Sequence, residues 1–580
     1  GGAARSGSPD LAIVGLALAV LTACGPGEPG HGVDVDRTLA HVASLTAIGP
    51  RPGDSAKARE AAAYIETSIA DAGGTPERYP VGAVDLPPIT VMGVTYRSAR
   101  RSESTDPNIV VRFGPPGRAL VIMAHYDTVH GSPGAVDNAA AVGVLVELAR
   151  ILARDPPPYG VMLAFTANEE VGLVGAEALA ARIGDDVAFA IALDLVGGSG
   201  DLVLNGASEM IGAEEMRWLA SAADRAGSTI RTPLAHRVVS RWWPQAERSD
   251  HGPFTRRGIR AIHFYNRGQD GEWIDLAYHS PRDVMERVDR SSVDELGRIL
   301  HALARVAPPA PGGDGFWIPV LRNRVLPRWA LLAIELVLAL VALGSLIASR
   351  SARARGGLGL LAGTACFALA AGATYLTEQL ARGDHPGPWI HAPLAAAIAE
   401  LLVFAGALGL ITLALRRMRA WNGELRYLVV AASIPLAVGV ALLVIGAAEL
   451  AWIWLLPAVV IALAPRLAVA RWLSPLVAAL PALLVLSPNQ LREAAWNGFL
   501  PATTSLALLL AMFILPVAAV VAYLARRRGA TGPLGSFVLP VGCLLSVIAG
   551  VVLVSRAHPR CTAPDFNQFH LACEATPGVR

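Results

Sequence analysis

The chain has 580 residues, of which 53% are hydrophobic and 17% are charged, and its mean hydropathy is +0.45. This composition is too apolar for an ordinary soluble protein, the length is too great for one domain, and five cysteines are too few for a disulfide-rich scaffold. The formal charge of +2 divides unevenly, because residues 1–315 carry a net −9 and residues 316–580 a net +11. An acidic soluble part argues against nucleic acid as a partner.

The N-terminal segment is typical of an export signal. Leu11–Ala23 is an apolar run of 13 residues, shorter than the roughly 20 residues that cross a bilayer. The run ends in LTACG, which resembles a bacterial lipobox and would make Cys24 the lipidated residue. Two alternatives stay open, a cleaved lipoprotein signal or a short uncleaved anchor. Both would export the downstream domain, so residues 1–32 are assigned to this signal or anchor and its flexible tether.

Residues 33–307 alternate strand-like and helix-like runs, which predicts an α/β domain with a sheet flanked by helices. Continuous apolar runs predict buried strands at Ala119–Ala124, Val161–Thr166 and Phe189–Leu193. Ala139–Ala153 has helical spacing. Function in such a sheet gathers at the C-terminal ends of its strands, which is where the polar residues occur.

These polar residues comprise two histidines and several carboxylates, namely His125, Asp127, Asp137, Glu169, Glu170, Asp194 and His279. Imidazole and carboxylate groups are suitable ligands for Zn²⁺. Two imidazoles and three carboxylates, five ligands in all, suit two ions about 3.5–4 Å apart with a shared carboxylate. Adjacent side chains in an extended segment diverge, so one glutamate of the Glu169–Glu170 pair can bind metal while the other accepts a proton. Each residue singly also fits a structural role, and their joint placement favours the metal site.

The motifs HYD at 125–127, VDN at 136–138, NEE-x-G-L-x-G from 168, LD at 193–194 and YHSPRD at 278–283 resemble a known family in their order. That family is the co-catalytic zinc aminopeptidases, in the superfamily of leucyl aminopeptidases and glutaminyl cyclases. The layout of the whole chain resembles the family's membrane branch, the endoplasmic-reticulum and vacuolar membrane metallopeptidases. The resemblance covers roughly residues 35–305 and implies a zinc-exopeptidase-like mixed sheet.

The resemblance also implies roles for individual residues. Two zinc ions per chain would be bound, one by His125, Asp137 and Asp194, the other by Asp137, Glu170 and His279, with Asp137 bridging. Glu169 would be the general base. Asp127 would accept the second N–H of His125 and fix its tautomer.

A second segment, Ser249–Phe254, resembles segments that line the pocket in this family, and the resemblance implies that it lies near the substrate pocket. Asp250 and His251 are candidate substrate-binding residues, and a structural turn is the alternative for Asp250. Trp242 and Trp243 are further candidates for a wall of the pocket, with core packing as the alternative. A serine-hydrolase triad is rejected here, because residues adjacent in sequence rarely have triad geometry.

The C-terminal half predicts an all-α polytopic membrane domain at residues 329–555, after a linker at 308–328 and before a tail at 556–580. Eight apolar spans are expected, at 329–348, 357–376, 393–415, 427–446, 450–464, 472–487, 505–524 and 534–555. The loops after spans one, three, five and seven hold twelve arginines and the alternate loops hold two. By the positive-inside rule this asymmetry places the peptidase domain and the tail on the non-cytoplasmic side, periplasmic, extracellular or lumenal.

Two pairs of residues in this half attract attention. Cys561 and Cys573 lie in the tail on the oxidising side, where a disulfide between them is expected, with two unpaired thiols as the alternative. Glu335 and Glu400 lie inside predicted spans, and we expect them to pair with groups inside the helix bundle.

The leading hypothesis is therefore a membrane-anchored zinc metallo-exopeptidase, an aminopeptidase that acts outside the cytoplasm. Its partners would be a peptide with a free N-terminus and the lipid bilayer. The alternatives are a single-zinc glutaminyl cyclase-like transferase, a non-catalytic receptor on the peptidase fold, and a transporter with an appended domain. Metal stoichiometry separates the aminopeptidase hypothesis from the cyclase alternative, because a cyclase uses one zinc and the aminopeptidase two.

Overall fold

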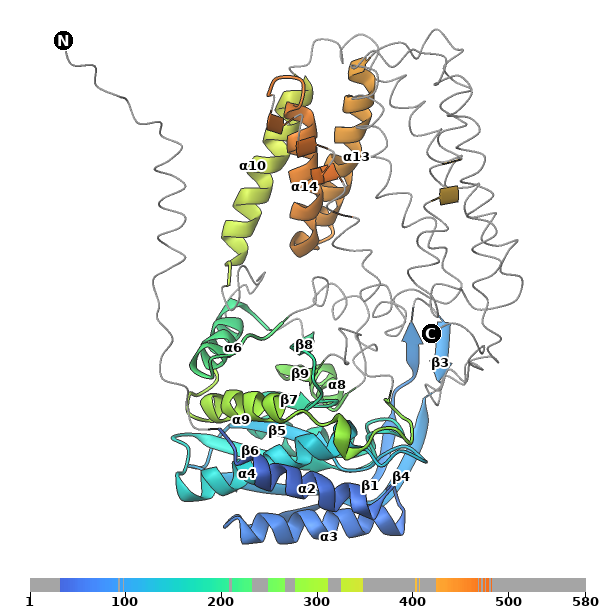
Figure 1. Cartoon of the computed structure of the whole chain (residues 1–580), viewed down its shortest axis with the longest axis vertical. Coiled ribbons are helices and arrows are strands. Elements are labelled where there is room, and N and C mark those ends of the chain that lie inside the picture. The colour runs from blue at the N-terminus through green and yellow to red at the C-terminus, as the bar shows by residue number, and fades with distance from the viewer. Residues whose placement is uncertain are drawn as a thin grey trace, which may run out of the picture.

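The computed structural model describes two regions of the chain. These are residues 32–310, apart from 92–93, 98, 208–210, 232–248 and 267–276, and then residues 325–347 and 424–467 with a few isolated residues from 402 to 481. The N-terminal region is a layered α/β domain, and three long helices lie beside one another away from it (Figure 1). The predicted segments at 1–31 and 482–580, including Cys24, Cys561 and Cys573, lie outside the described residues.

A seven-stranded mixed sheet forms the centre of the α/β domain, in the order β1-β4-β6-β5-β7-β9-β8. The four central strands β6, β5, β7 and β9 are parallel, and β4, β1 and β8 are antiparallel to their neighbours. The strands are β1 Glu77–Leu86, β4 Arg100–Phe113, β5 Ala119–His125, β6 Gly160–Thr166, β7 Val187–Leu193, β8 Leu202–Ala207 and β9 Ala261–Asn266. A separate two-stranded sheet pairs β2 Ile89–Val91 with β3 Val94–Arg97.

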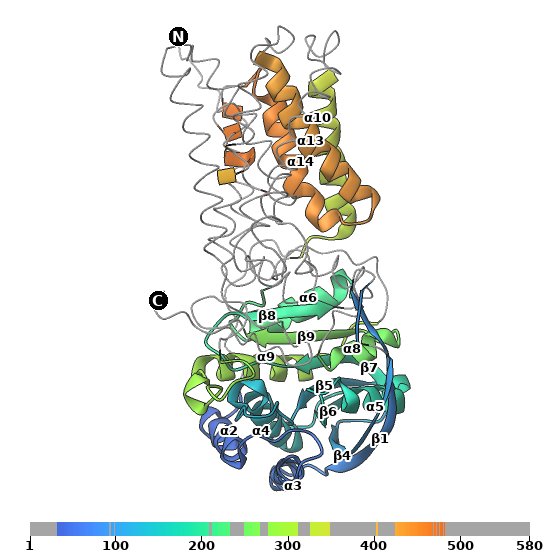
Figure 2. The same cartoon turned by 90° about the vertical axis from the view of Figure 1, so that its right-hand side faces the viewer.

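Helices cover both faces of the sheet (Figure 2). The larger core packs one face against α2 Val35–Ile48, α3 Ala56–Asp71, α4 Ala140–Arg154, α6 Ala213–Arg225 and α9 Arg290–Ala304. The smaller core packs the other face against α5 Val174–Ile183 and α8 His251–Arg256. All seven residues of β5 and all seven of β6 are buried, which explains why these strands read as unbroken apolar runs. The predicted mixed sheet with flanking helices is confirmed.

Local chemistry sets the ends of several of these helices. Asp34 caps α2 by accepting a hydrogen bond from the backbone N–H of Arg37 at 3.0 Å. Ser55 caps α3 and Asp289 caps α9 in the same way. Such caps satisfy backbone donors that the first helical turn leaves unpaired. The start of α4 is different, because a kinked turn, η1 Ala135–Ala139, precedes it, with non-helical backbone at Asp137 and Asn138.

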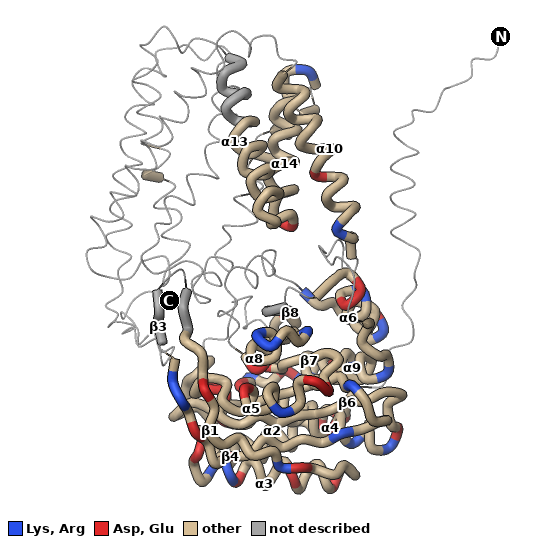
Figure 3. The backbone as a smooth tube through the Cα atoms, turned by 180° about the vertical axis from the view of Figure 1, so that it is seen from behind, with Lys and Arg blue, Asp and Glu red and all other residues tan. Residues whose placement is uncertain are grey.

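The helices α10 Arg328–Ile347, α13 Glu424–Val444 and α14 Ala448–Leu463 coincide with the predicted first, fourth and fifth spans. Among the residues described, α10 is the one helix both long and apolar enough to cross a bilayer, with 20 residues and a mean hydropathy of 2.6. Charged residues are common along the α/β domain and sparse along the described parts of these helices (Figure 3). Glu335 of α10 is buried and accepts a hydrogen bond from the backbone N–H of Trp452 in α14 at 3.1 Å. The other predicted spans, and Glu400, lie wholly or mostly outside the described residues.

Candidate metal centre

The sheet brings the predicted ligands together at one edge. His125 is the last residue of β5, Glu169 and Glu170 follow β6, and Asp194 follows β7. Because these three strands run parallel, their carboxyl ends meet at the same edge of the sheet. Asp137 reaches this edge from η1 and His279 from the loop that follows β9.

His125 lies between two carboxylates. Its Nε2 atom is 3.2 Å from Oδ1 of Asp137 and 3.4 Å from Oδ1 of Asp194. His125 and Asp137 are buried and Asp194 is slightly exposed. One ligand atom from each of these three residues lies within 4.8 Å of the others, which is compact enough to hold a metal ion.

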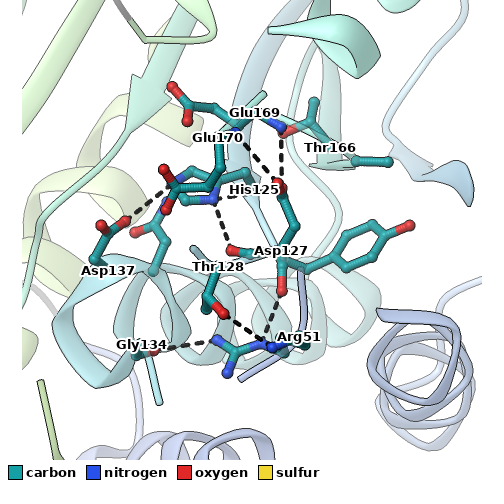
Figure 4. Close-up of polar contacts among 12 residues, drawn as sticks. Arg51, His125, Asp127, Thr128, Gly134, Asp137, Thr166, Glu169 and Glu170 are labelled. Carbon is teal, nitrogen blue, oxygen red and sulfur yellow. Dashed lines mark hydrogen bonds and ion pairs between the residues drawn. The ribbon is translucent and has the colours of Figure 1, made fainter. Parts of the chain in front are cut away.

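A second cluster shares Asp137 with the first. Nε2 of His279 lies 3.3 Å from Oδ2 of Asp137 and 3.0 Å from Oε2 of Glu170. Asp137 therefore turns one carboxylate oxygen toward each imidazole (Figure 4 shows Asp137, His125 and Glu170). A third compact group, His125 with Glu169 and Glu170, overlaps both clusters. All five residues predicted as ligands are thus adjacent.

Asp127 organises the turn that carries the two glutamates. Its Oδ1 accepts a hydrogen bond from the backbone N–H of Glu169 at 3.0 Å, and its Oδ2 accepts one from Glu170 at 3.2 Å (Figure 4). Its carboxylate is 3.7 Å from Nδ1 of His125, whereas its backbone carbonyl oxygen is only 3.1 Å away. The oxygen of Asp127 that lies nearest to Nδ1 of His125 is therefore the backbone carbonyl oxygen. The carboxylate of Asp127 mainly fixes the backbone of Glu169 and Glu170.

Burial and mutual charge perturb the titration of these groups. Burial raises the pKa of Glu170 to about 7, with Asp137 adding to the effect. Burial also raises the pKa of Glu169 well above its ordinary value, and the neighbouring carboxylates add to this. Burial alone would lower the pKa of His279, but Glu170 and Asp137 raise it to about 10. Desolvated groups with strong charge partners of this kind are typical of functional sites.

The donor set fits a divalent metal ion. Four carboxyl groups face two imidazoles within the overlapping clusters, so acidic groups outnumber basic ones. Oε1 of Glu170 is buried and has no hydrogen-bond partner among the described residues. Buried acceptors and unbalanced negative charge are costly unless a cation compensates them. Imidazole nitrogen and carboxylate oxygen without sulfur suit zinc in a catalytic rather than a structural setting.

Of the residues predicted to line the pocket, the structure describes Asp250 and His251. Asp250 is buried and accepts a hydrogen bond from the Thr166 hydroxyl at the end of β6. His251 is buried, and its ring stacks on that of His263 in β9 with centroids 5.4 Å apart. Arg256 and Arg257, just after this segment, pair with Glu177 of α5 and so link the end of α8 to α5. Trp242 and Trp243 lie outside the described residues.

Two residues with extensive contacts near the site were not singled out by the sequence. Arg51 is fully buried and donates hydrogen bonds to backbone carbonyls of the two segments that carry His125 and Asp137 (Figure 4). Asp283 is also buried and accepts hydrogen bonds from the backbone beside Asp137. Asp283 was visible as the last letter of the YHSPRD motif, whereas no local pattern marks Arg51.

A mixed α/β sheet with two overlapping histidine–carboxylate clusters at the carboxyl ends of its strands is an arrangement suited to metal-dependent hydrolysis. Residues 108–304 match the model of Peptidase family M28. It resembles aminopeptidase YwaD of Bacillus subtilis (strain 168), with 29% identity over 195 residues, 32% of this chain and 40% of the relative.

Two further proteins mark the extent of the similarity. The vacuolar membrane protease of Clavispora lusitaniae is 26% identical over 224 residues, 36% of this chain and 19% of the relative. The crystal structure of BSAP, a zinc aminopeptidase from Bacillus subtilis, matches with a TM-score of 0.39 and 16% identity, covering 47% of this chain and 95% of that one. The chain thus spans less than half the length of both curated relatives. The predicted family resemblance is confirmed.

Proposed function

We propose that the protein is a membrane-anchored, zinc-dependent aminopeptidase that hydrolyses the first peptide bond of peptides outside the cytoplasm. One observation carries the proposal: Asp137 presents one oxygen to His125 and the other to His279, each within its own compact cluster. A carboxylate shared in this way is suited to two ions about 3.5–4 Å apart. His125, Asp137 and Asp194 would hold one zinc, and Asp137, Glu170 and His279 the other.

Bound zinc would polarise the scissile carbonyl and lower the pKa of a water molecule. Glu169 then serves as the proton acceptor, because its buried carboxyl group lies against the ligand cluster. Its backbone N–H is held by the hydrogen bond to Asp127. The two hydrogen bonds from Glu169 and Glu170 to Asp127 set the directions in which the glutamate side chains leave the backbone. Glu170 thereby turns to His279 while Glu169 stays free to carry a proton at its carboxylate oxygen toward the leaving amine.

Sequence features support the exported, membrane-bound part of the proposal. The apolar N-terminal run and the arginine asymmetry of the C-terminal half both favour the non-cytoplasmic side for residues 33–307. Helix α10 follows the α/β domain after a short linker and is long enough to cross the bilayer. The proposed organisation is a signal or anchor at 1–32, the peptidase domain, a linker at 308–328, membrane spans at 329–555 and a tail at 556–580.

The test is metal analysis of the full chain purified in detergent, alongside hydrolysis of aminoacyl substrates. We expect two zinc ions per chain and cleavage of a substrate with a free α-amine, with the N-acetylated form of the same substrate as the control. One zinc per chain together with cyclisation of N-terminal glutamine would favour a transferase. A chain that binds zinc but neither hydrolyses the aminoacyl substrate nor cyclises N-terminal glutamine would favour a receptor. A chain that binds no zinc would refute the proposal.

A further inference from the structure

The segment Pro133–Asp137, which ends at the shared carboxylate, is held by its carbonyl groups on one side. The guanidinium group of Arg51 donates hydrogen bonds to the carbonyl oxygens of Pro133 at 2.6 Å and Gly134 at 3.1 Å (Figure 4 draws the bond to Gly134). Nε of Arg51 also donates to the carbonyl oxygen of Tyr126, between His125 and Asp127, at 2.8 Å. One buried cation therefore links the Asp137 segment to the end of β5.

The same segment is held by its N–H groups on the other side. Oδ1 of Asp283 accepts a hydrogen bond from Val136 at 2.8 Å, and Oδ2 accepts one from Asp137 at 3.1 Å. The backbone carbonyl of Asp283 accepts a third, from Ala135, at 3.3 Å. Three consecutive backbone donors thus converge on one residue whose side chain is only 2% exposed.

Asp283 also belongs to the loop that carries His279. Asp283 lies four positions after His279, and turn hydrogen bonds link Ser280 to Ala277 and Asp283 to Ser280, both at 3.1 Å. The position of Asp137 relative to His279 therefore depends on Asp283, just as its position relative to His125 depends on Arg51. Neither Arg51 nor Asp283 belongs to the three groups that could hold a metal ion among the described residues.

We infer that Asp283 and Arg51 are positioning residues that set the shared carboxylate of Asp137 between the two half-sites and so control zinc affinity. The inference rests on the proposed function. Asp283→Asn keeps the shape of the side chain but replaces one acceptor oxygen by an NH₂ group. That group would face the backbone N–H of Val136 or Asp137, and because two donors cannot pair, the segment must shift. Loss of such an outer contact typically lowers metal affinity by about 10–100-fold. Because Asp137 serves both clusters, binding of both ions should weaken.

The experiment measures zinc affinity of the metal-free full chain by competition with a chelator of known affinity, and thermal unfolding of the same metal-free samples. Asp289→Ala is the control, because Asp289 accepts a hydrogen bond from the backbone N–H of Ser292 at 2.9 Å as the cap of α9, and its side-chain hydrogen bonds within the described part of the chain go to Ser291 and Ser292. Both variants should unfold at a lower temperature than the wild type. D283N alone should lose about 10-fold or more in zinc affinity, while D289A should bind as the wild type does.

Zinc binding by D283N at wild-type affinity would overturn the inference and leave the proposed function intact. If D283N shows no cooperative unfolding, Arg51→Lys takes its place, because lysine keeps the charge but cannot bond the separated carbonyls in the same fork geometry. The same loss of affinity in R51K supports the inference, and wild-type affinity overturns it. A wild-type chain that binds no zinc would refute the proposed function and this inference together.

Discussion

Glu147 offers a test of how the structure is held together away from the metal centre. Its carboxylate on α4 is 1% exposed and accepts a hydrogen bond from Nε of Arg37 on α2 at 2.8 Å. Arg150 contacts the other oxygen at 3.1 Å, and His41 lies 3.4 Å from it. Burial alone would raise the pKa of Glu147, but His41, Arg37 and Arg150 lower it from 4.5 to about 2. The perturbation is Glu147→Gln, which removes the charge and keeps the shape.

The pKa shift sets the size and the pH dependence of the effect. A shift of this size corresponds to about 3.4 kcal/mol of free energy of unfolding, and screening at the half-exposed Arg37 reduces it to about 2 kcal/mol. Because the folded-state pKa is depressed, this stability is fully present above pH 4.5 and is lost as the pH falls through 2. The difference between wild type and E147Q should therefore be constant at neutral pH and fall to roughly 40% of that value at about pH 3.

The assay is thermal unfolding of the full chain in detergent from about pH 3 to about pH 8, with metal chelated so that its loss at low pH does not contribute. At about pH 7 we expect the midpoint of E147Q to lie about 4–8 °C below that of the wild type. Glu66→Gln is the matched control, because the Glu66–Arg78 pair is more exposed and such pairs contribute about 0–1 kcal/mol. A difference between E147Q and wild type that does not change with pH would refute the reasoning.

Three further outcomes are expected. Glu169→Gln should keep both metal ions and lower turnover by about 10²–10⁴-fold, because it removes only the proton acceptor; unchanged turnover would contradict that role. Asp137→Ala should lose metal and activity together, as measured by zinc content and hydrolysis, and a variant that retains two ions would show that Asp137 is not shared. Gly134→Ala should lower the unfolding midpoint more than Gly227→Ala: both glycines have positive φ, +65° and +67°, but only at Gly134 would a Cβ overlap neighbouring atoms, those of Thr128 and Asp137. Equal shifts would show that the site can relax around the added methyl group.

The central strands could be predicted from the sequence because their physical signal is local. Strands β5, β6 and β7 are buried on both faces, so they appear as unbroken apolar runs, and the structure extends the first only by His125. The strand β4 gives no such signal, since its first half is charged and partly exposed. Its pairing with β1 and β6 depends on contacts between distant segments, which periodicity does not report.

The same distinction applies to the metal centre. The five candidate ligands could be predicted because chemically distinctive residues follow recognisable strands. The role of Asp127 was only partly predicted, because its contacts with the backbone of Glu169 and Glu170 depend on how two loops fold together. Arg51 could not be predicted, since its partners in the described structure are backbone carbonyls and a hydroxyl from separate segments, and such partners leave no mark on composition or spacing.

The scattering of the candidate ligands along the chain has a consequence for when this protein can act. They come from five segments between His125 and His279, and they become neighbours only when the whole sheet has assembled. Each of these five segments holds one of them, too few to retain a catalytic ion. If the chain is the exported peptidase proposed above, a polypeptide still being synthesised or translocated would be unable to cleave surrounding peptides. Its activity would then begin only when folding is complete.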